Sequence, residues 1–195
     1  MPEPLRGLVP QLAAGELPWP LTVWGSAGTG KTCFGLTLVD YCGGFFWSTD
    51  DFCEVMADAK MGRLTTPGAQ REISATELWQ ELACTSLVVL DELGTTKEIS
   101  DHHYRSVKRL LDLRENLPMV VMMNVPLYQI AVSYGEPVAS RLAGGTVCKL
   151  EGQDRRLSDD ARSSQPEARE NQAHPRPGTP GAFSNQAGTG PVVPG

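Results

Sequence analysis

Short apolar runs alternate with helix-like segments along most of the chain. From Leu21 onward, short apolar runs are followed by segments whose apolar residues recur every three or four positions. This alternation is typical of consecutive βα units, in which helices connect the strands of a parallel sheet. The predicted strands are PLTVW (20–24), GGFFWS (43–48), SLVVLDELG (86–94), MVVMMN (119–124) and TVCKL (146–150). The pattern therefore predicts an α/β protein built as one doubly wound layer sandwich.

The helix-like segments between these strands carry start signals. Ser74 precedes Glu77 by three positions, which is the spacing of a capping box. Ser48, Thr49 and Asp50 are each suitable N-cap residues for the helix that follows them. The predicted helices cover residues 31–41, 50–60, 74–85 and 100–116, and a broken helical region covers residues 127–142.

The composition changes after Leu157. Residues 158–195 are rich in Ser, Pro, Gly, Gln and Asn and contain almost no large apolar side chains. Such a segment cannot bury enough apolar surface to offset the entropy lost on ordering. We therefore expect a folded domain over residues 1–157 and a disordered tail over residues 158–195. The tail is either a non-binding extension, which is the favoured interpretation, or a tether that binds a partner.

Charge and cysteine content narrow the classes of protein to consider. The 195-residue chain has a formal net charge of −6 and 41% hydrophobic residues, which gives no global field for attracting DNA or anionic membranes. Its five cysteines form no CxxC pair, so reduced core thiols are favoured over zinc ligands or disulfides. The first 20 residues lack the pattern of a secretory signal, and no apolar run approaches the roughly 20 residues of a membrane helix. These features predict a cytoplasmic protein with no membrane partner.

Between the first predicted strand and the first predicted helix, GSAGTGKT (25–32) matches the phosphate-loop pattern GxxxxGK[ST] in full. Its glycines allow backbone turns that point successive N–H groups at phosphate oxygens, and the helix adds the positive end of its dipole. Lys31 is expected to neutralise the β- and γ-phosphates, and the Thr32 hydroxyl to ligate Mg²⁺. The residues expected to bind the nucleotide are Gly25, Ser26, Ala27, Gly28, Thr29, Gly30, Lys31 and Thr32. A bare glycine turn would not need the final Lys-Thr, so ATP and Mg²⁺ are the predicted cofactors.

Polar residues follow two of the buried strands. Asp91 and Glu92 come directly after an apolar run, and ligands of such sheets bind outside the carboxyl ends of the strands. We expect Asp91 to hold the Mg²⁺ shell and Glu92 to polarise the attacking water as general base. Asn124 ends the next strand and is a candidate for positioning the γ-phosphate or the water. The alternatives are a helix cap for Asp91 and a turn for Asn124.

Four segments, taken in order, resemble the AAA+ ATPases of the DnaC/IstB type, which are helicase loaders and transposition helper proteins. The segments are GSAGTGKT, LVVLDELG, MVVMMN and GEPVASRLAGGTVCKLEGQDRRL, and the resemblance covers residues 21–157. It implies the P-loop NTPase (AAA+/ASCE) fold, a three-layer αβα sandwich with a five-stranded parallel sheet. For single residues it implies sensor 1 at Asn124, an arginine finger for the neighbouring subunit's ATP site at Arg141, and γ-phosphate sensing at Arg155 or Arg156. A finger supplied by a neighbour implies a homo-oligomer.

The resemblance also implies a function. It is that of an ATP-hydrolysing accessory protein in DNA replication, through helicase loading, or in transposition. The implied partners are single-stranded DNA and a replicative helicase or a transposase. Two alternatives stay open: a nucleotide-gated module that binds a partner and hydrolyses little, and a small-molecule P-loop kinase, which would need an arginine-rich lid.

One helix carries a candidate basic face. Arg105, Lys108 and Arg109 fall on one side of the helix predicted over 100–116, where they are candidates for contacting DNA phosphates. The favoured interpretation is an exposed face balanced by the acidic residues of the same helix. His102 and His103 are adjacent and point in different directions on a helix, which argues against a shared metal.

Overall fold

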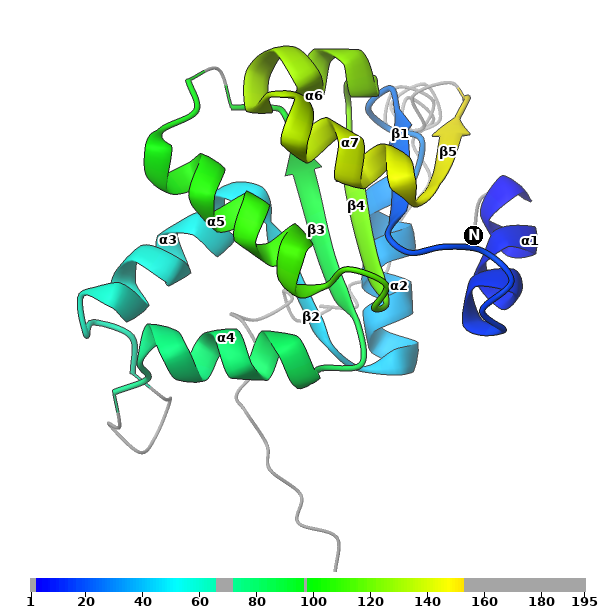
Figure 1. Cartoon of the computed structure of the whole chain (residues 1–195). Coiled ribbons are helices and arrows are strands. Elements are labelled where there is room, and N and C mark those ends of the chain that lie inside the picture. The colour runs from blue at the N-terminus through cyan, green and yellow to red at the C-terminus, as the bar shows by residue number, and fades with distance from the viewer. Residues whose placement is uncertain (1–2, 66–71, 97, 153–195) are drawn as a thin grey trace, which may run out of the picture.

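The predicted parallel sheet is present, with helices on both of its faces (Figure 1). A computed structural model describes residues 3–65, 72–96 and 98–152. Its strands are β1 Leu21–Gly25, β2 Phe45–Ser48, β3 Val88–Leu93, β4 Met119–Met123 and β5 Thr146–Leu150. They pair in the order β2-β3-β4-β1-β5, and every pairing is parallel. The five strands predicted from the sequence are confirmed, whereas the expected tail over residues 158–195 lies outside the described residues.

The predicted helices are present as well. These are α2 Lys31–Cys42, α3 Thr49–Lys60, α4 Ala75–Cys84, α5 Asp101–Leu113, α6 Leu127–Tyr134 and α7 Glu136–Gly144, and a further helix, α1 Glu3–Ala13, precedes β1. Ser74 and Glu77 form the predicted capping box of α4. Of the three candidate caps for α3, Ser48 is the one used, because its hydroxyl accepts the Asp51 N–H. The broken helical region is α6 and α7, which meet at Gly135 with φ 81°.

Helix α1 is the element that the sequence pattern does not predict. Pro10 lies inside it, and proline is unfavourable in a helix interior. Its apolar side chains compensate, because Leu5 and Leu12 are buried in the same cluster as residues of β1 and β5. Tertiary packing therefore forms this helix against its local propensity.

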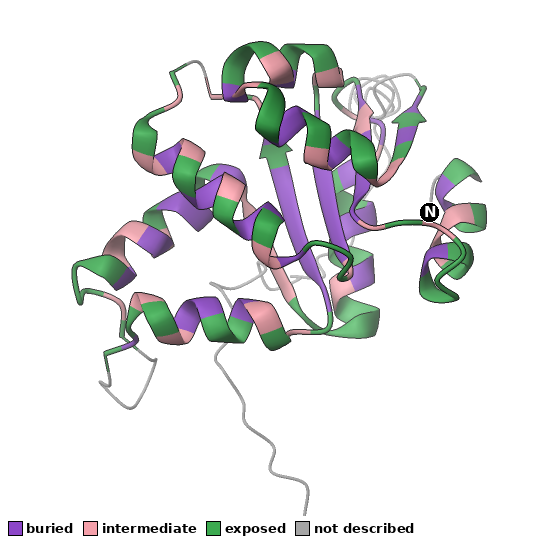
Figure 2. Ribbon diagram, viewed as in Figure 1, coloured by how far each residue is buried: buried purple, intermediate pink, exposed green. Residues whose placement is uncertain are grey.

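The core divides into two clusters, one on each face of the sheet. Along β3, Val88 and Leu90 belong to the cluster that also holds buried residues of α3 to α7, whereas Val89 belongs to the cluster with α1 and α2. Successive strand residues point to opposite faces, so a strand covered on both faces must be apolar at every position. Strand β4 is accordingly buried along its whole length, and β3 is buried except at Glu92 near its end (Figure 2). The result is the three-layer sandwich that the sequence predicts.

Arg114, at the end of α5, is a buried charge with a structural role. Only 2% of it is exposed. Nη1 donates to the carbonyls of Leu82, Ala83 and Thr85 at the end of α4, and Nη2 donates to the Pro118 carbonyl before β4. Burial lowers its pKa, and these carbonyls together with the negative end of the α4 dipole hold the charge. Arg114 thus fastens α4 to the start of β4.

Arg114→Ala is expected to lower the free energy of unfolding by about 2 to 4 kcal/mol, because it leaves several buried carbonyls without donors. Denaturant unfolding measures this change. Arg105→Ala is the matched control, since Arg105 lies exposed on the same helix with an Asp101 partner at 3.8 Å. Its substitution is expected to change stability by less than about 0.5 kcal/mol. Equal effects of the two substitutions would contradict the role of Arg114.

Candidate functional site

The predicted chemistry gathers at the carboxyl edge of the sheet. Because the strands are parallel, their carboxyl ends meet at one edge. The phosphate loop follows β1, Asp91 and Glu92 end β3, and Asn124 follows β4, which pairs with both β1 and β3. Asn124 is exposed at this edge. The strand order therefore places Asn124 between the loop and the two carboxylates, as the sequence predicts.

The phosphate loop depends on its glycines for two different reasons. Gly28 and Gly30 have φ values of 76° and 91°, in the left-handed region that favours glycine. Gly25 is required by packing instead, since a Cβ there would lie 2.2 Å from the carbonyl oxygen of Leu150 on β5. Helix α2 then begins with Gly30 as its N-cap and no side-chain cap. Its first N–H groups are therefore suited to an anion.

The Lys31 side chain is folded into this loop. It is 6% exposed, and Nζ donates to the carbonyl oxygens of Gly25 at 2.9 Å and Ser26 at 2.8 Å. A buried ammonium group needs such partners, and phosphate oxygens are the ligands to which it is most suited. The loop thus encloses a positive charge at the place where phosphates are expected.

Thr32 and Asp91 come together from opposite sides of the site. The Thr32 hydroxyl donates to Asp91 Oδ2 at 2.7 Å, although the residues are 59 positions apart. Asp91 is 4% exposed, and Oδ1 accepts the Glu92 N–H at 2.8 Å. A hydroxyl and a carboxylate fit Mg²⁺, which takes few protein ligands and completes its octahedron with phosphate oxygens and water. Among the described residues no cluster of three or more His, Cys, Asp or Glu offers another metal site.

Glu92, next to Asp91 in the chain, is exposed. Its backbone is left-handed, with φ 62°, which is uncommon for a residue other than glycine and recurs at functional sites. Asp91 and Glu92 thus differ in environment: the first is buried against Thr32, and the second faces solvent at the edge of the sheet. The roles that the sequence predicts for them, a Mg²⁺ ligand at Asp91 and a general base at Glu92, stay predictions.

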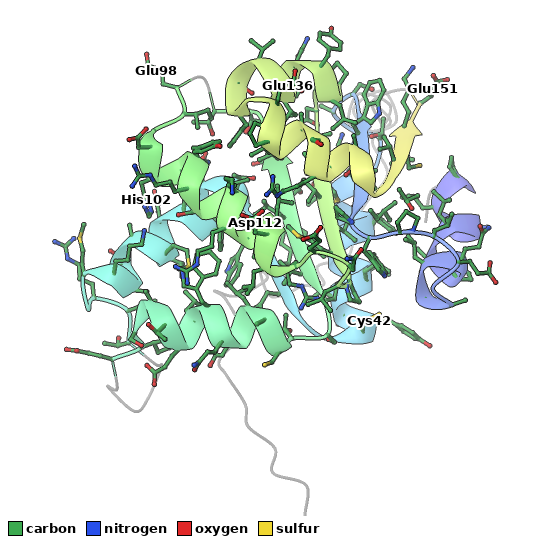
Figure 3. The ribbon with its side chains drawn as sticks, in the orientation of Figure 1. Cys42, Glu98, His102, Asp112, Glu136 and Glu151 are labelled. Atoms are coloured by element: carbon green, nitrogen blue, oxygen red, sulfur yellow. The ribbon has the colours of Figure 1, made fainter. Side chains whose placement is uncertain are left out.

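Arg141 contacts residues of α7 and α5 within its own chain. On α7, its Nη1 donates to the Pro137 carbonyl at 2.8 Å and its Nε contacts Asp112 Oδ1 on α5. Figure 3 shows Asp112 between α5 and α7. Asp112 Oδ2 also accepts from Lys108 at 2.7 Å. Partial burial acts to raise the pKa of Asp112, but the hydrogen bonds and charges of Lys108 and Arg141 outweigh it and lower that pKa.

The structure does not describe every predicted site residue. Arg155 and Arg156 lie outside the described residues, so their predicted role in sensing the γ-phosphate stays a prediction.

The candidate basic face of α5 is largely paired. Arg105 lies 3.8 Å from Asp101, Lys108 lies 2.7 Å from Asp112, and Arg109 stacks over the Trp79 ring. This agrees with the favoured interpretation of an exposed face balanced by acids.

The two histidines of α5 have different partners. His102 Nε2 lies 3.0 Å from the Cys53 carbonyl oxygen, and His103 Nε2 lies 3.8 Å from Asp50 Oδ1. Burial lowers the pKa of His103, which the charge of Asp50 opposes. The two histidines therefore contact different residues.

Thr49 is the residue near the site that sequence reasoning missed. It resembles a helix cap, but its hydroxyl donates to the Asp91 carbonyl at 2.8 Å. The sequence did contain a signal for this contact. A polar residue directly after β2 must lie at the same edge of the sheet as the end of β3, where Asp91 is. The sequence pattern did not show which of three adjacent polar residues turns toward β3.

Comparisons of the sequence find no relative. No family model matches the chain, and no curated protein matches its sequence.

Among the described residues, no helix is both long and apolar enough to cross a membrane.

Solved structures match over most of the chain. AMPPCP-bound DnaA from Aquifex aeolicus matches 85% of this chain and 52% of its own, with a TM-score of 0.61 and 17% identity. The DnaC helicase loader matches 67% of this chain and 77% of its own, with a TM-score of 0.54 and 19% identity. DnaI matches 79% of this chain and 83% of its own, with a TM-score of 0.57 and 17% identity. This chain therefore spans about half the length of the DnaA structure, and its fold is similar to the folds of DnaA, DnaC and DnaI.

Proposed function

We propose that this chain binds ATP with Mg²⁺ and hydrolyses it, as a DnaC/IstB-like AAA+ accessory protein in DNA replication or transposition. The hydrogen bond between Thr32 and Asp91 carries the proposal. It joins the phosphate loop to the carboxylate of a different strand, which a glycine turn alone would not require. The AMPPCP-bound DnaA structure, which has a similar fold, supports a nucleoside triphosphate as the ligand.

Each residue of the site then has one task. The loop N–H groups and Lys31 bind the phosphates, and Thr32 and Asp91 would hold Mg²⁺. When bound, that ion neutralises charge on the phosphate oxygens. Glu92 accepts a proton from the attacking water, and Asn124 orients the water or the γ-phosphate.

Arg141 is proposed to complete the site of a second copy. Within its own chain it contacts Asp112, so it must leave that carboxylate to reach a neighbour's phosphates. The side chains of Arg141 and Asp112 are 37% and 38% exposed, and ion pairs at such positions stabilise by only about 0.2 to 1 kcal/mol. Lys108 stays with Asp112 after release, which lowers the cost further. A homo-oligomer with Arg141 acting between subunits is therefore energetically accessible.

The proposed macromolecular partners follow from the resemblance and the matched structures. One matched DnaA structure is bound to AMPPCP and single-stranded DNA, and DnaC is a helicase loader. We propose single-stranded DNA together with a replicative helicase or a transposase.

A second candidate function is a nucleotide-gated module that binds a partner and hydrolyses little. The contact between Arg141 and Asp112 favours it, because an arginine held by its own chain contributes nothing to a neighbour's reaction.

ATP turnover per chain, measured against protein concentration with and without a single-stranded oligonucleotide, tests the proposed function. Turnover per chain is expected to rise with concentration as subunits complete one another's sites, and to rise further with DNA. Arg141→Ala is expected to remain at the low-concentration rate throughout. Arg105→Ala, assayed without DNA, is the control and is expected to follow the wild type.

A turnover per chain that does not depend on concentration and is unchanged by Arg141→Ala would contradict the shared site. ATP binding without turnover under every condition would favour the nucleotide-gated module.

A further inference from the structure

The backbone at Glu92 is held in a conformation that ordinary residues avoid. Its φ is 62°, in the left-handed region. The pairing of β3 with β4 shifts register between Leu90 and Leu93, so the regular ladder is interrupted around Glu92. A strained residue persists only where neighbouring groups hold it. Those neighbours therefore determine where the Glu92 carboxylate lies.

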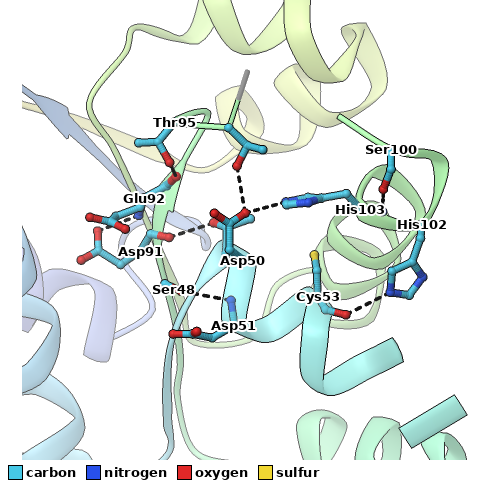
Figure 4. A network of polar contacts seen from close by, with 12 residues as sticks. Ser48, Asp50, Asp51, Cys53, Asp91, Glu92, Thr95, Ser100, His102 and His103 are labelled. Atoms are coloured by element: carbon cyan, nitrogen blue, oxygen red, sulfur yellow. Dashed lines mark hydrogen bonds and ion pairs between the residues drawn. The ribbon is translucent and has the colours of Figure 1, made fainter. Parts of the chain in front are cut away.

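Two of the hydrogen bonds that hold the Glu92 backbone come from residues within three positions of it in the sequence. The Glu92 N–H donates to Asp91 Oδ1 at 2.8 Å, and the Thr95 hydroxyl donates to the Glu92 carbonyl at 2.8 Å (Figure 4). Thr95 would move together with Glu92 and only shapes the turn. Asp91 is also held by the Thr32 hydroxyl, but that contact lies on one side of Glu92 alone.

Two further contacts come from the first turn of α3. The Thr49 hydroxyl donates to the Asp91 carbonyl at 2.8 Å, and the Thr96 hydroxyl donates to Asp50 Oδ1 at 2.8 Å. The first contact lies before Glu92 in the sequence and the second after it. Helix α3 thus holds the chain on both sides of Glu92.

The start of α3 is a firm anchor. Ser48 pairs with Asp91 in the parallel ladder of β2 and β3, and it caps the helix through the Asp51 N–H. Phe52 and Met56, in the next turns, are fully buried. Asp50 lies between the end of β3 and His103 of α5 (Figure 4), with Oδ1 3.8 Å from His103 Nε2. The anchor is therefore fixed to the core and to a second helix.

We propose that Thr49 and Asp50 form a positioning element for Glu92. The inference rests on the proposed hydrolysis of ATP, in which Glu92 is the general base. Both are positioning residues: Thr49 acts through the Asp91 backbone carbonyl before Glu92, and Asp50 acts through the Thr96 hydroxyl after it. Thr49 has the larger effect, because it is 1% exposed and its hydrogen bond lies in a region of low dielectric constant.

Thr49→Val is the first test, because it replaces the hydroxyl with a methyl group of similar size. We expect kcat for ATP to fall about threefold to tenfold, the effect of one buried hydrogen bond, with KM unchanged. Thr49→Ser keeps the hydroxyl and is expected to restore kcat. Asp50→Ala, at an exposed position, removes the acceptor of Thr96 and is expected to lower kcat about twofold.

Two comparisons separate positioning from a loss of stability. Thr146→Val removes another 2.8 Å hydrogen bond, from Thr146 on β5 to the Pro18 carbonyl, and is expected to keep the wild-type kcat. In a Glu92→Gln background, Thr49→Val is expected to change the residual turnover by less than about twofold, because its effect passes through Glu92.

An unchanged kcat in both Thr49→Val and Asp50→Ala would overturn the proposal, as would an undiminished effect of Thr49→Val in the Glu92→Gln background. If Glu92→Gln itself leaves turnover unchanged, the general-base role fails and the positioning proposal fails with it. If Glu92→Gln abolishes turnover while Thr49→Val does not lower kcat, only the positioning proposal fails.

Discussion

Lys31→Ala is expected to abolish ATP binding, with the Kd rising at least about a hundredfold, equivalent to about 2.7 kcal/mol. The Lys31 ammonium group lies inside the phosphate loop, within 2.9 Å of the Gly25 and Ser26 carbonyl oxygens. Its removal takes away the charge that would balance the phosphates and leaves those carbonyls facing them. Titration of the folded variant with ATP measures the change.

Lys60→Ala is the control for this substitution. Lys60 is exposed at the end of α3, where Nζ lies 3.3 Å from His102 Nδ1, and its loss is expected to leave the Kd within about twofold of the wild type. ATP affinity that survives in Lys31→Ala would contradict the phosphate-binding role of the loop.

Glu92→Gln is expected to retain ATP binding but to lower turnover by about 10² to 10⁴. The amide has nearly the same shape as the carboxylate but cannot accept a proton from water. The hydrogen bonds that hold this segment come from its backbone and from neighbouring side chains, so the substitution leaves them in place. Phosphate release and ATP binding, measured on the same preparation, separate the two effects.

Glu98→Gln is the control for Glu92→Gln, because Glu98 is an exposed glutamate in the loop that follows β3. It is expected to have wild-type turnover. Turnover that is equal in Glu92→Gln and the wild type would show that Glu92 does not activate the water.

The predictions made from the sequence agree with the structure where a single physical rule determines the outcome. Strand β4 and the part of β3 that precedes Asp91 are apolar at every position because both faces of the sheet are covered. The contact between Thr32 and Asp91 follows from the meeting of parallel strand ends at one edge. These features depend on patterns within a few residues and on one topological rule.

The features that escaped prediction depend on packing between distant segments. Helix α1 forms although Pro10 disfavours it, because the burial of Leu5 and Leu12 outweighs the effect of the proline. Thr49 reaches Asp91 because β2 and β3 pair in a register that sets Ser48 opposite Asp91. No local pattern specifies that register.

The position of Arg141 in an isolated chain escaped prediction for the same reason. Its contact with Asp112 arises where α5 and α7 pack together. The resemblance implies a role between subunits for Arg141, but the segment around it contains no signal for the residue that the side chain contacts within its own chain.

Phosphate release from ATP by the full chain, with Mg²⁺ and after its removal by a chelator, tests the central claim most directly. The proposed function predicts turnover that requires Mg²⁺ and is absent from Lys31→Ala at every protein concentration. Phosphate release that persists without Mg²⁺ or in Lys31→Ala would contradict hydrolysis at this site, and so would its absence from the wild type at all concentrations with DNA present.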